Sequence, residues 1–480
     1  MLGSTQALRR AGAAGVVAVV LTACGVWVSV AVGHPAQAQH LSLLTFLVVP
    51  AILLALFDSP YLVPYILFTF AVTPEVRRVS DWLEGVFNSL SPISLAPTIA
   101  SMALLIPVIK HGAGISGRLR GLMVLFGLAL GYGLILGMRS NGEGALLDLA
   151  NYGCPALMIP YITARRRDEA TWDRWVSALA CMAVLVAVYG WIQFLVAPAW
   201  DVFWMEQAPI SSIGQPEPYK IRVFSTLNSP GPTGAFLAAA LAPMLLERRW
   251  RGFFGAAGVV LVATALGITL NRTAWLSAAV CVVAYVATST GRTRWRTALS
   301  VMAAGVCLYF LVPLLPGGDT ISSRAQTFGK LGTDTSARAR TGFLQAWLSV
   351  FEDEPLGRGL GAVGVVGKVA TGGDAAQYQD FDNGFIAIAF TFGILGSAAV
   401  FCTLIMLARA VWRHGRTQRW PPYARLGIGM LAAGAVGLAS YNFLPGLGGV
   451  LTWMFVGFAL HGAQRREAAV ARAARSQAYG

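Results

Sequence analysis

The sequence predicts an all-α fold, a polytopic bundle of about 14 transmembrane helices with a long, partly helical periplasmic loop. Three observations lead to this prediction. Of the 480 residues, 56% are hydrophobic and 12% are charged, whereas charged residues approach a quarter of an ordinary globular chain. Apolar stretches long enough to cross a membrane recur along the whole sequence. Basic residues gather in alternate loops between these stretches.

The apolar stretches give the predicted membrane spans. We interpret the first as a retained helix rather than a signal peptide, because the chain re-enters the membrane at once. No separate soluble domain is left over, so residues 1–480 are expected to form a single integral-membrane domain. The predicted spans are 15–32, 41–57, 61–72, 94–109, 122–137, 146–163, 177–196, 233–246, 253–270, 274–287, 298–315, 384–407, 426–441 and 450–461.

The charges between the spans predict the orientation. With the N-terminus in the cytoplasm, the cytoplasmic segments hold 24 of the 36 Lys and Arg residues but 6 of the 22 Asp and Glu residues. This bias follows the positive-inside rule, so both termini are predicted to be cytoplasmic, including the tail 463–480. The net charge of +14 therefore reflects orientation, and no nucleic-acid partner is expected. The outer segments are 73–93, 197–232 and 316–383, and the length of the last is typical of a functional loop.

Several kinds of site are not indicated by the residues. The six cysteines all fall inside apolar spans and show neither a disulfide framework nor a zinc-binding spacing. The five histidines are not clustered, and no phosphate-binding loop or nucleophile elbow is present. We therefore expect no metal and no cofactor.

Arginines in the predicted outer segments go against the positive-inside rule, which makes them candidates for anion binding. Arg222 lies in a polar stretch that leads into a span, and Arg272 is placed between two spans with no room for a solvated loop. Several guanidinium groups on one cavity would hold a diphosphate through bidentate hydrogen bonds. The alternative is that they pair with outer acids or reach lipid head groups. The other outer arginines are Arg77, Arg78, Arg324, Arg338, Arg340 and Arg358.

Acidic residues stand directly before the predicted span 384–407. Asp380, Asp382 and Asn383 should lie at the mouth of this helix. A carboxylate in this position has two interpretations: Asp382 is a general base, or it only caps the helix.

At these positions the chain resembles the superfamily of O-antigen ligases and polysaccharide polymerases, which are integral-membrane glycosyltransferases. The upstream stretches 74–82 and 198–204 resemble a subgroup associated with exopolysaccharide loci. The similar stretches in the superfamily are Arg222-Val-Phe-Ser-Thr-Leu-Asn-Ser-Pro, Asn271-Arg-Thr-Ala-Trp-Leu, Asp334-Thr-Ser-Ala-Arg-Ala-Arg, Pro355-Leu-Gly-Arg-Gly-Leu-Gly and Asp382-Asn-Gly-Phe-Ile.

The resemblance implies a metal-independent, inverting transfer of a glycan from an undecaprenyl-diphosphate-linked oligosaccharide to a hydroxyl acceptor. The site would face the periplasm from a multi-pass position in the bacterial inner membrane. The implied partners are this lipid-linked oligosaccharide, membrane lipids, a flippase and a chain-length regulator. By analogy, the catalytic residues are Asp382, Arg272 and Arg340, and the substrate-binding residues are Arg222, Arg338, Arg324, Asn383 and Asn228.

Polymerase and ligase differ only in the acceptor, which is another lipid-linked repeat unit or a lipid A core or protein. Ligases of the family usually carry a histidine where Asp382 stands. This departure and the upstream stretches favour a polymerase, with a ligase as the alternative. A transporter or flippase would also need a cavity with arginines, although no inverted repeat is visible in the sequence.

Overall fold

A computed structural model of the chain describes residues 35–89, 91–164, 169–208, 213–314, 316–319, 321, 343–364 and 381–461. Within these residues the chain is helical and has no strand beyond one isolated bridge, between Gly214 and Ile221. The predicted all-α, polytopic membrane fold is confirmed. The predicted first span and the tail 463–480 lie outside the described residues.

The helices of the described residues follow the predicted spans. In chain order they are α2 (Pro35–Leu56), α3 (Leu62–Glu84), η1 (Pro92–Leu95), α4 (Ala96–Met102), α5 (Leu105–His111), η2 (Gly112–Gly114), α6 (Gly117–Ser140), α7 (Gly144–Ala156), α8 (Met158–Thr163), α9 (Glu169–Val196), α10 (Ala199–Gln207), α11 (Pro230–Leu246), η3 (Arg248–Trp250), α12 (Gly255–Ile268), α13 (Arg272–Thr288), α14 (Gly291–Leu311), η4 (Val312–Leu314), α17 (Phe343–Asp353), α19 (Gly384–Thr417), α20 (Pro422–Leu438) and a final helix, Gly446–His461.

Six helical stretches in the described residues are long and apolar enough to cross a membrane, and four shorter apolar helices accompany them. The predicted number of about 14 spans stays a prediction. Some predicted spans differ in shape from a single straight helix. Span 94–109 folds as η1, α4 and α5, and span 146–163 is divided into α7 and α8 at Leu157. Helix α3 continues past the predicted end at residue 72 to Glu84.

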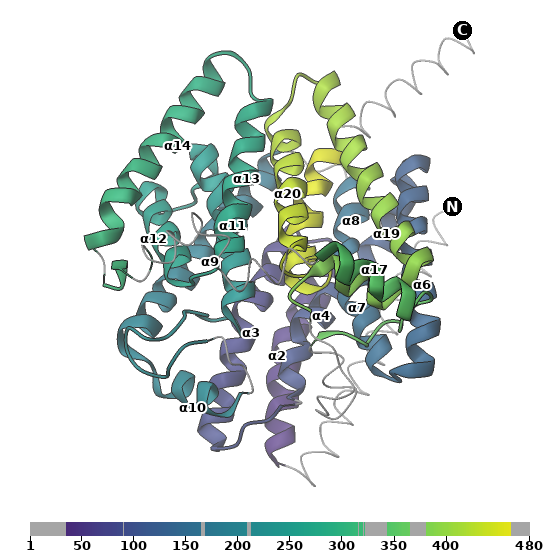
Figure 1. Cartoon of the computed structure of the whole chain (residues 1–480), viewed down its shortest axis with the longest axis horizontal. Coiled ribbons are helices and arrows are strands. Elements are labelled where there is room, and N and C mark those ends of the chain that lie inside the picture. The colour runs from purple at the N-terminus through teal and green to yellow at the C-terminus, as the bar shows by residue number, and fades with distance from the viewer. Residues whose placement is uncertain are drawn as a thin grey trace.

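The loops between the helices gather at two opposite ends of the bundle. Loops at the same end contact one another. At one end, Asp173 accepts hydrogen bonds from Arg249 and Tyr423, and the Trp175 indole donates to the carbonyl of Pro60. These loops are those with the predicted cytoplasmic charge. In Figure 1 the turns from α13 to α14 and from α19 to α20 lie at the top, whereas α10 lies at the bottom. The loops predicted to be outside meet at the second end.

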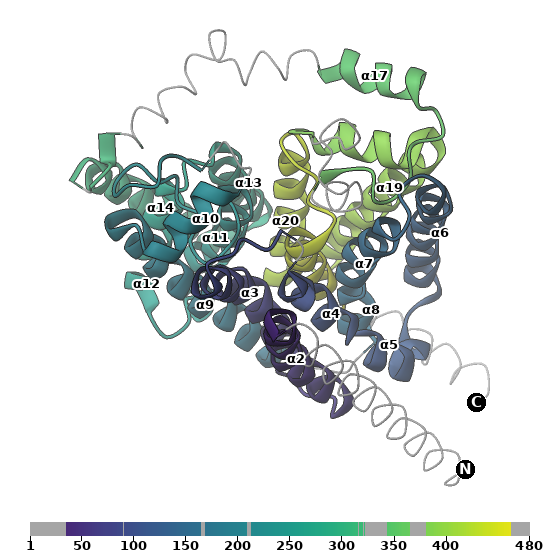
Figure 2. The same ribbon diagram turned by 90° about the horizontal axis from the view of Figure 1, so that it is seen from below.

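Among the described helices, α13 and α20 make the most extensive contact with each other. Figure 2 shows α12 and α14 on one side of the bundle and α6 and α19 on the other, with α20 between them. The two central helices approach closely because Gly429 has no side chain, and a Cβ there would come within 2.8 Å of the Cys281 carbonyl oxygen. This packing fixes the position of the N-terminus of α13, where Arg272 lies.

Helix α19 is interrupted at Gly393, whose backbone has a φ of 58°. The segment 355–361 lies against this interruption. The backbone N–H groups of Arg358 and Gly359 donate to the carbonyls of Phe390 and Thr391, at 2.8 and 2.9 Å. The segment therefore supplies partners for carbonyls that a continuous helix would have satisfied itself.

Candidate functional site

Arg222 joins two outer segments that are far apart in the sequence. Its Nε donates a hydrogen bond to the carbonyl of Thr269 at 2.9 Å, and its Nη2 donates to the carbonyl of Leu270 at 3.4 Å. The backbone N–H of Val223 also donates to the carbonyl of Ile268 at 3.4 Å. Arg222 is half-buried. The structure therefore places Arg222 beside the turn that carries Arg272.

Arg272 is the first residue of α13, directly after a side-chain cap. The Asn271 carboxamide accepts a hydrogen bond from the N–H of Ala274 at 3.2 Å and donates one to the carbonyl of Pro230 at 3.2 Å. Asn271 therefore ties the start of α13 to the start of α11. The half-buried Arg272 guanidinium adds its charge to the positive end of the helix dipole, which favours an anion at this point.

The N-termini of α13 and α19 share one neighbour, the loop 439–445. The hydroxyl of Thr273 hydrogen-bonds to that of Ser440 at 2.7 Å. Gly384 lies so close to this loop that a Cβ would come within 2.5 Å of the Tyr441 carbonyl oxygen. The segments that carry Arg272 and Asp382 thus lie at the same end of the bundle.

The structure decides whether Asp382 caps helix α19. The cap is Asn383, whose side-chain oxygen accepts hydrogen bonds from the N–H groups of Phe385 and Ile386 at 2.9 and 3.2 Å. Asn383 is buried, whereas the side chain of Asp382 is exposed. Asp382 therefore does not cap α19, and its carboxylate faces the solvent side of this end.

A cavity of about 440 Å³ lies beside Arg222. Its walls combine cationic and apolar side chains, with Lys220 and Arg222 next to Phe194, Ile268 and Leu270. Such a lining suits an amphiphilic anion, because the guanidinium and ammonium groups can bind phosphate oxygens while the apolar wall contacts hydrocarbon.

Asn228 lies in the same outer segment, 222–229. Its side chain is half-buried, and its buried Oδ1 has no hydrogen-bond partner among the described residues. The Thr226 hydroxyl is in the same situation. Buried polar atoms are normally hydrogen-bonded, so a polar ligand at this segment would satisfy them.

Arg77 and Arg78 are two of the outer arginines that the sequence indicates as candidates for anion binding, and both are paired with acids. Arg77 lies 3.5 Å from Asp81, and the Arg78 Nε lies 2.9 Å from Asp201. Arg78 is fully buried, and it also pairs with Glu75. The alternative interpretation of outer arginines, pairing with outer acids, holds for these two.

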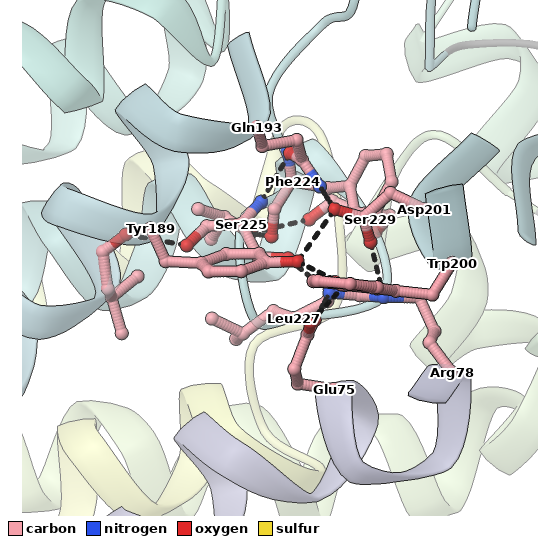
Figure 3. A network of polar contacts seen from close by, with 12 residues as sticks. Glu75, Arg78, Tyr189, Gln193, Trp200, Asp201, Phe224, Ser225, Leu227 and Ser229 are labelled. Atoms are coloured by element: carbon pink, nitrogen blue, oxygen red, sulfur yellow. Dashed lines mark hydrogen bonds and ion pairs between the residues drawn. The ribbon is translucent and has the colours of Figure 1, made fainter. Parts of the chain in front are cut away.

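The residues around Arg78 form a buried polar network that the sequence did not reveal (Figure 3). Asp201 accepts hydrogen bonds from the Tyr189 hydroxyl and the Gln193 carboxamide, each at 2.8 Å. Burial raises the pKa of Glu75, although Arg78 opposes the shift. Burial would lower the pKa of Arg78, but Glu75 and Asp201 outweigh it and hold the pKa above the ordinary value. We call Arg78, Gln193 and Asp201 the Arg78 cluster.

The remaining candidates are only partly described. Arg358 pairs with Glu354 at 2.6 Å and lies over the ring of Phe390, with its guanidinium carbon 5.6 Å from the ring centre. In the described part of the chain, no three His, Cys, Asp or Glu side chains are grouped as metal ligands. The candidates that lie outside the described residues are Arg324, Arg338, Arg340, Asp334 and Asp380.

Residues 257–401 match a family model described as O-antigen ligase. The matched residues include α12, α13, α14, α17 and the first half of α19, and therefore both Arg272 and Asp382. A search of curated proteins found no match. The resemblance expected from the sequence is confirmed: the match of residues 257–401 supports the superfamily of O-antigen ligases and polysaccharide polymerases.

Proposed function

We propose that the protein is a membrane glycosyltransferase that polymerises undecaprenyl-diphosphate-linked oligosaccharide repeat units into exopolysaccharide or O-antigen. The observation that supports it best is the meeting of three outer segments at one end of the bundle. Arg222 binds the carbonyls of the α12–α13 turn, Arg272 opens α13, and Asp382 precedes α19 beside the loop 439–445.

The chemistry that this arrangement would support is a single displacement. The acceptor hydroxyl attacks the anomeric carbon of the donor glycan, its proton passes to a base, and the bond from that carbon to the lipid diphosphate breaks. The diphosphate is already a good leaving group, so the protein mainly has to stabilise the charge that develops on it. Arg222 and Arg272, with Arg340, would bind the diphosphate. The exposed Asp382 carboxylate would accept the proton.

The proposed orientation follows from charge. The end of the bundle with the candidate residues carries the outer loops with few Lys and Arg residues, and the opposite end carries the basic clusters. We therefore place the site at the periplasmic face of the bacterial inner membrane. A flippase that delivers the lipid-linked unit and a chain-length regulator are the expected partners.

A ligase is the second candidate, because the matching family model is described as O-antigen ligase. The two are separated by the acceptor. Purified protein in liposomes would be given the lipid-linked repeat unit alone, and the products would be resolved by gel electrophoresis. A ladder of longer lipid-linked glycans supports the polymerase. Product that forms only when a lipid A core or protein acceptor is added supports the ligase. Movement of intact donor across the bilayer without transfer would instead support a flippase.

A further inference from the structure

The segment 222–229 contains a stretch of irregular backbone that is buried in the bundle. Phe224, Ser225 and Leu227 are all buried, and Ser225 has a φ of 52°, in the left-handed region that few residues other than glycine adopt. Buried irregular backbone is tolerated only where hydrogen bonds satisfy its polar groups. The conformation of the stretch must therefore be imposed by its surroundings.

Side chains of the surrounding helices supply these hydrogen bonds from two directions. The Gln193 carboxamide oxygen accepts from the N–H groups of Phe224 and Ser225, at 2.9 and 2.8 Å. On the carbonyl side, the Arg78 guanidinium donates to the carbonyls of Ser225 and Leu227. The same guanidinium lies over the ring of Phe224, 4.9 Å from its centre. Donors and acceptors of one short stretch are thus both bound by the Arg78 cluster (Figure 3).

Asp201 connects Arg78 and Gln193, the two side chains that bind the backbone of segment 222–229. It forms the ion pair with the Arg78 Nε at 2.9 Å and accepts from the Gln193 Nε2 at 2.8 Å. All three side chains are fully buried. An ion pair in such surroundings is costly unless its remaining hydrogen-bonding groups are satisfied. Here the second Asp201 oxygen accepts from Tyr189 and Gln193. The remaining N–H groups of Arg78 bind Glu75 and the backbone of segment 222–229.

The stretch held by the cluster lies between two residues that we assign to donor binding. Arg222 precedes Phe224 by two residues, and Asn228 directly follows Leu227. We propose that Arg78, Gln193 and Asp201 are positioning residues, which set the backbone of segment 222–229 so that Arg222 and Asn228 face the donor. This inference rests on the proposed function for the identity of the donor. It joins the two upstream stretches, 74–82 and 198–204, to the site.

A positioning role predicts an effect on donor affinity. If the segment is not held, it must be ordered each time the donor binds, and this cost raises the donor KM. A defect limited to folding would reduce the amount of active protein and so lower the maximal rate, but it would leave KM unchanged. Hydrogen exchange at the N–H groups of Phe224 and Ser225 reports the same ordering without any substrate.

An exchange of chemical groups between Gln193 and Asp201 tests the proposal. Gln193→Glu keeps the oxygen that faces the backbone but places a carboxylate against Asp201. Asp201→Asn replaces one acceptor oxygen by an NH2 group, which must then face the NH2 group of Gln193 or the Nε–H of Arg78. We expect each single variant to raise the donor KM about tenfold at pH 8 and to speed exchange in segment 222–229, because like groups then face each other. The double variant Gln193→Glu with Asp201→Asn restores a donor facing an acceptor, so its KM should return to within about threefold of wild type.

A neighbouring buried arginine provides the control. Arg77 lies on the same helix and pairs with Asp81, but its hydrogen bonds go to Ser94 and to the carbonyl of Asn88, away from segment 222–229. Arg77→Lys should therefore leave KM and exchange unchanged, whereas Arg78→Lys should raise both. If a single variant of Gln193 or Asp201 does not accumulate in the membrane, the comparison of Arg78→Lys with Arg77→Lys still tests the positioning role.

The possible failures are distinct. Unchanged KM and exchange in the single variants, or no recovery in the double variant, would refute the positioning role. Absence of any transfer by the wild-type protein from added lipid-linked donor would instead refute the proposed function. The exchange measurement would still test whether the cluster holds the segment.

Discussion

Gly234 controls how closely α11 approaches the start of α13, so Gly234→Ala is a sharp test of the site geometry. An added Cβ would lie 2.8 Å from the Cβ of Ala274 and 2.9 Å from the Nδ2 of Asn271. Carbon atoms in ordinary contact are about 3.5–4.0 Å apart. The two helices must therefore separate by about 1 Å, and Asn271 must move with the cap of α13. Overpacking of this kind costs about 1–3 kcal/mol of stability.

The expected functional effect is separate from the effect on stability. A shift of about 1 Å at Arg272 is enough to reduce turnover about 100-fold where the residue contacts the reacting group. We expect Gly234→Ala to be inserted in the membrane at near-normal levels, with kcat/KM lowered about 10-fold to 100-fold. Transfer from the lipid-linked donor, normalised to the amount of protein, is the assay.

Gly127→Ala is the control. Gly127 is exposed in the middle of α6, and no neighbouring side chain or segment comes within 4 Å of an added Cβ. The change from glycine to alanine inside a helix favours the helix by up to about 1 kcal/mol. Gly127→Ala should therefore be as active and at least as stable as wild type. Equal activity of the two variants would show that the spacing of α11 and α13 does not set the position of Arg272.

Four further outcomes are expected. Arg272→Lys keeps the charge but loses the bidentate fork, so kcat/KM should fall at least about tenfold, and wild-type kinetics would exclude bidentate binding there. Asp382→Asn should bind donor normally yet form little polymer; near-normal polymer would move the search for a base to Asp380, Asp334 or Glu217. Polymer formation in purified membranes should survive EDTA, and activity that is lost on chelation and restored by Mg²⁺ or Mn²⁺ would contradict this. Reporter fusions at Ala375 and Arg416 should report periplasm and cytoplasm, and a cytoplasmic signal from Ala375 would reverse the proposed orientation.

The helices were predictable from sequence because a run of apolar residues long enough to cross a membrane has few other structures open to it. Their interruptions were not. Residues 146–163 are mostly apolar, yet the helix divides at Leu157, between Pro155 and Pro160. The interruption at Gly393 depends on the segment 355–361, which binds against it. The local sequence around Gly393 does not predict this long-range contact.

The candidate site was predictable in part. Unexpected arginines on the outer side identified Arg222 and Arg272, and the structure brings their segments together. The contact itself depends on the spacing of α11 and α13, which rests on the absence of a side chain at Gly234. The Arg78 cluster was missed because its members come from three separate helices, and Gln193 lies in an apolar span where nothing signals a polar role. The available signal was that Arg78 and Asp201 lie in the stretches 74–82 and 198–204, which both resemble the exopolysaccharide subgroup.

The interruption of α19 has a consequence for how the protein is made. The segment 355–361 is held on several sides, since the N–H of Leu360 donates to the carbonyl of Gly133 and the N–H of Gly361 donates to Asp148. This loop segment precedes α19 in the chain, so it has already been synthesised when that helix enters the bilayer. Until it docks, α19 can satisfy the carbonyls of Phe390 and Thr391 only as a continuous helix, because unpaired carbonyls cost several kcal/mol each in hydrocarbon. The interruption at Gly393 and the docking of the loop are therefore coupled, and truncation of the loop would change the shape of α19 as well as catalysis.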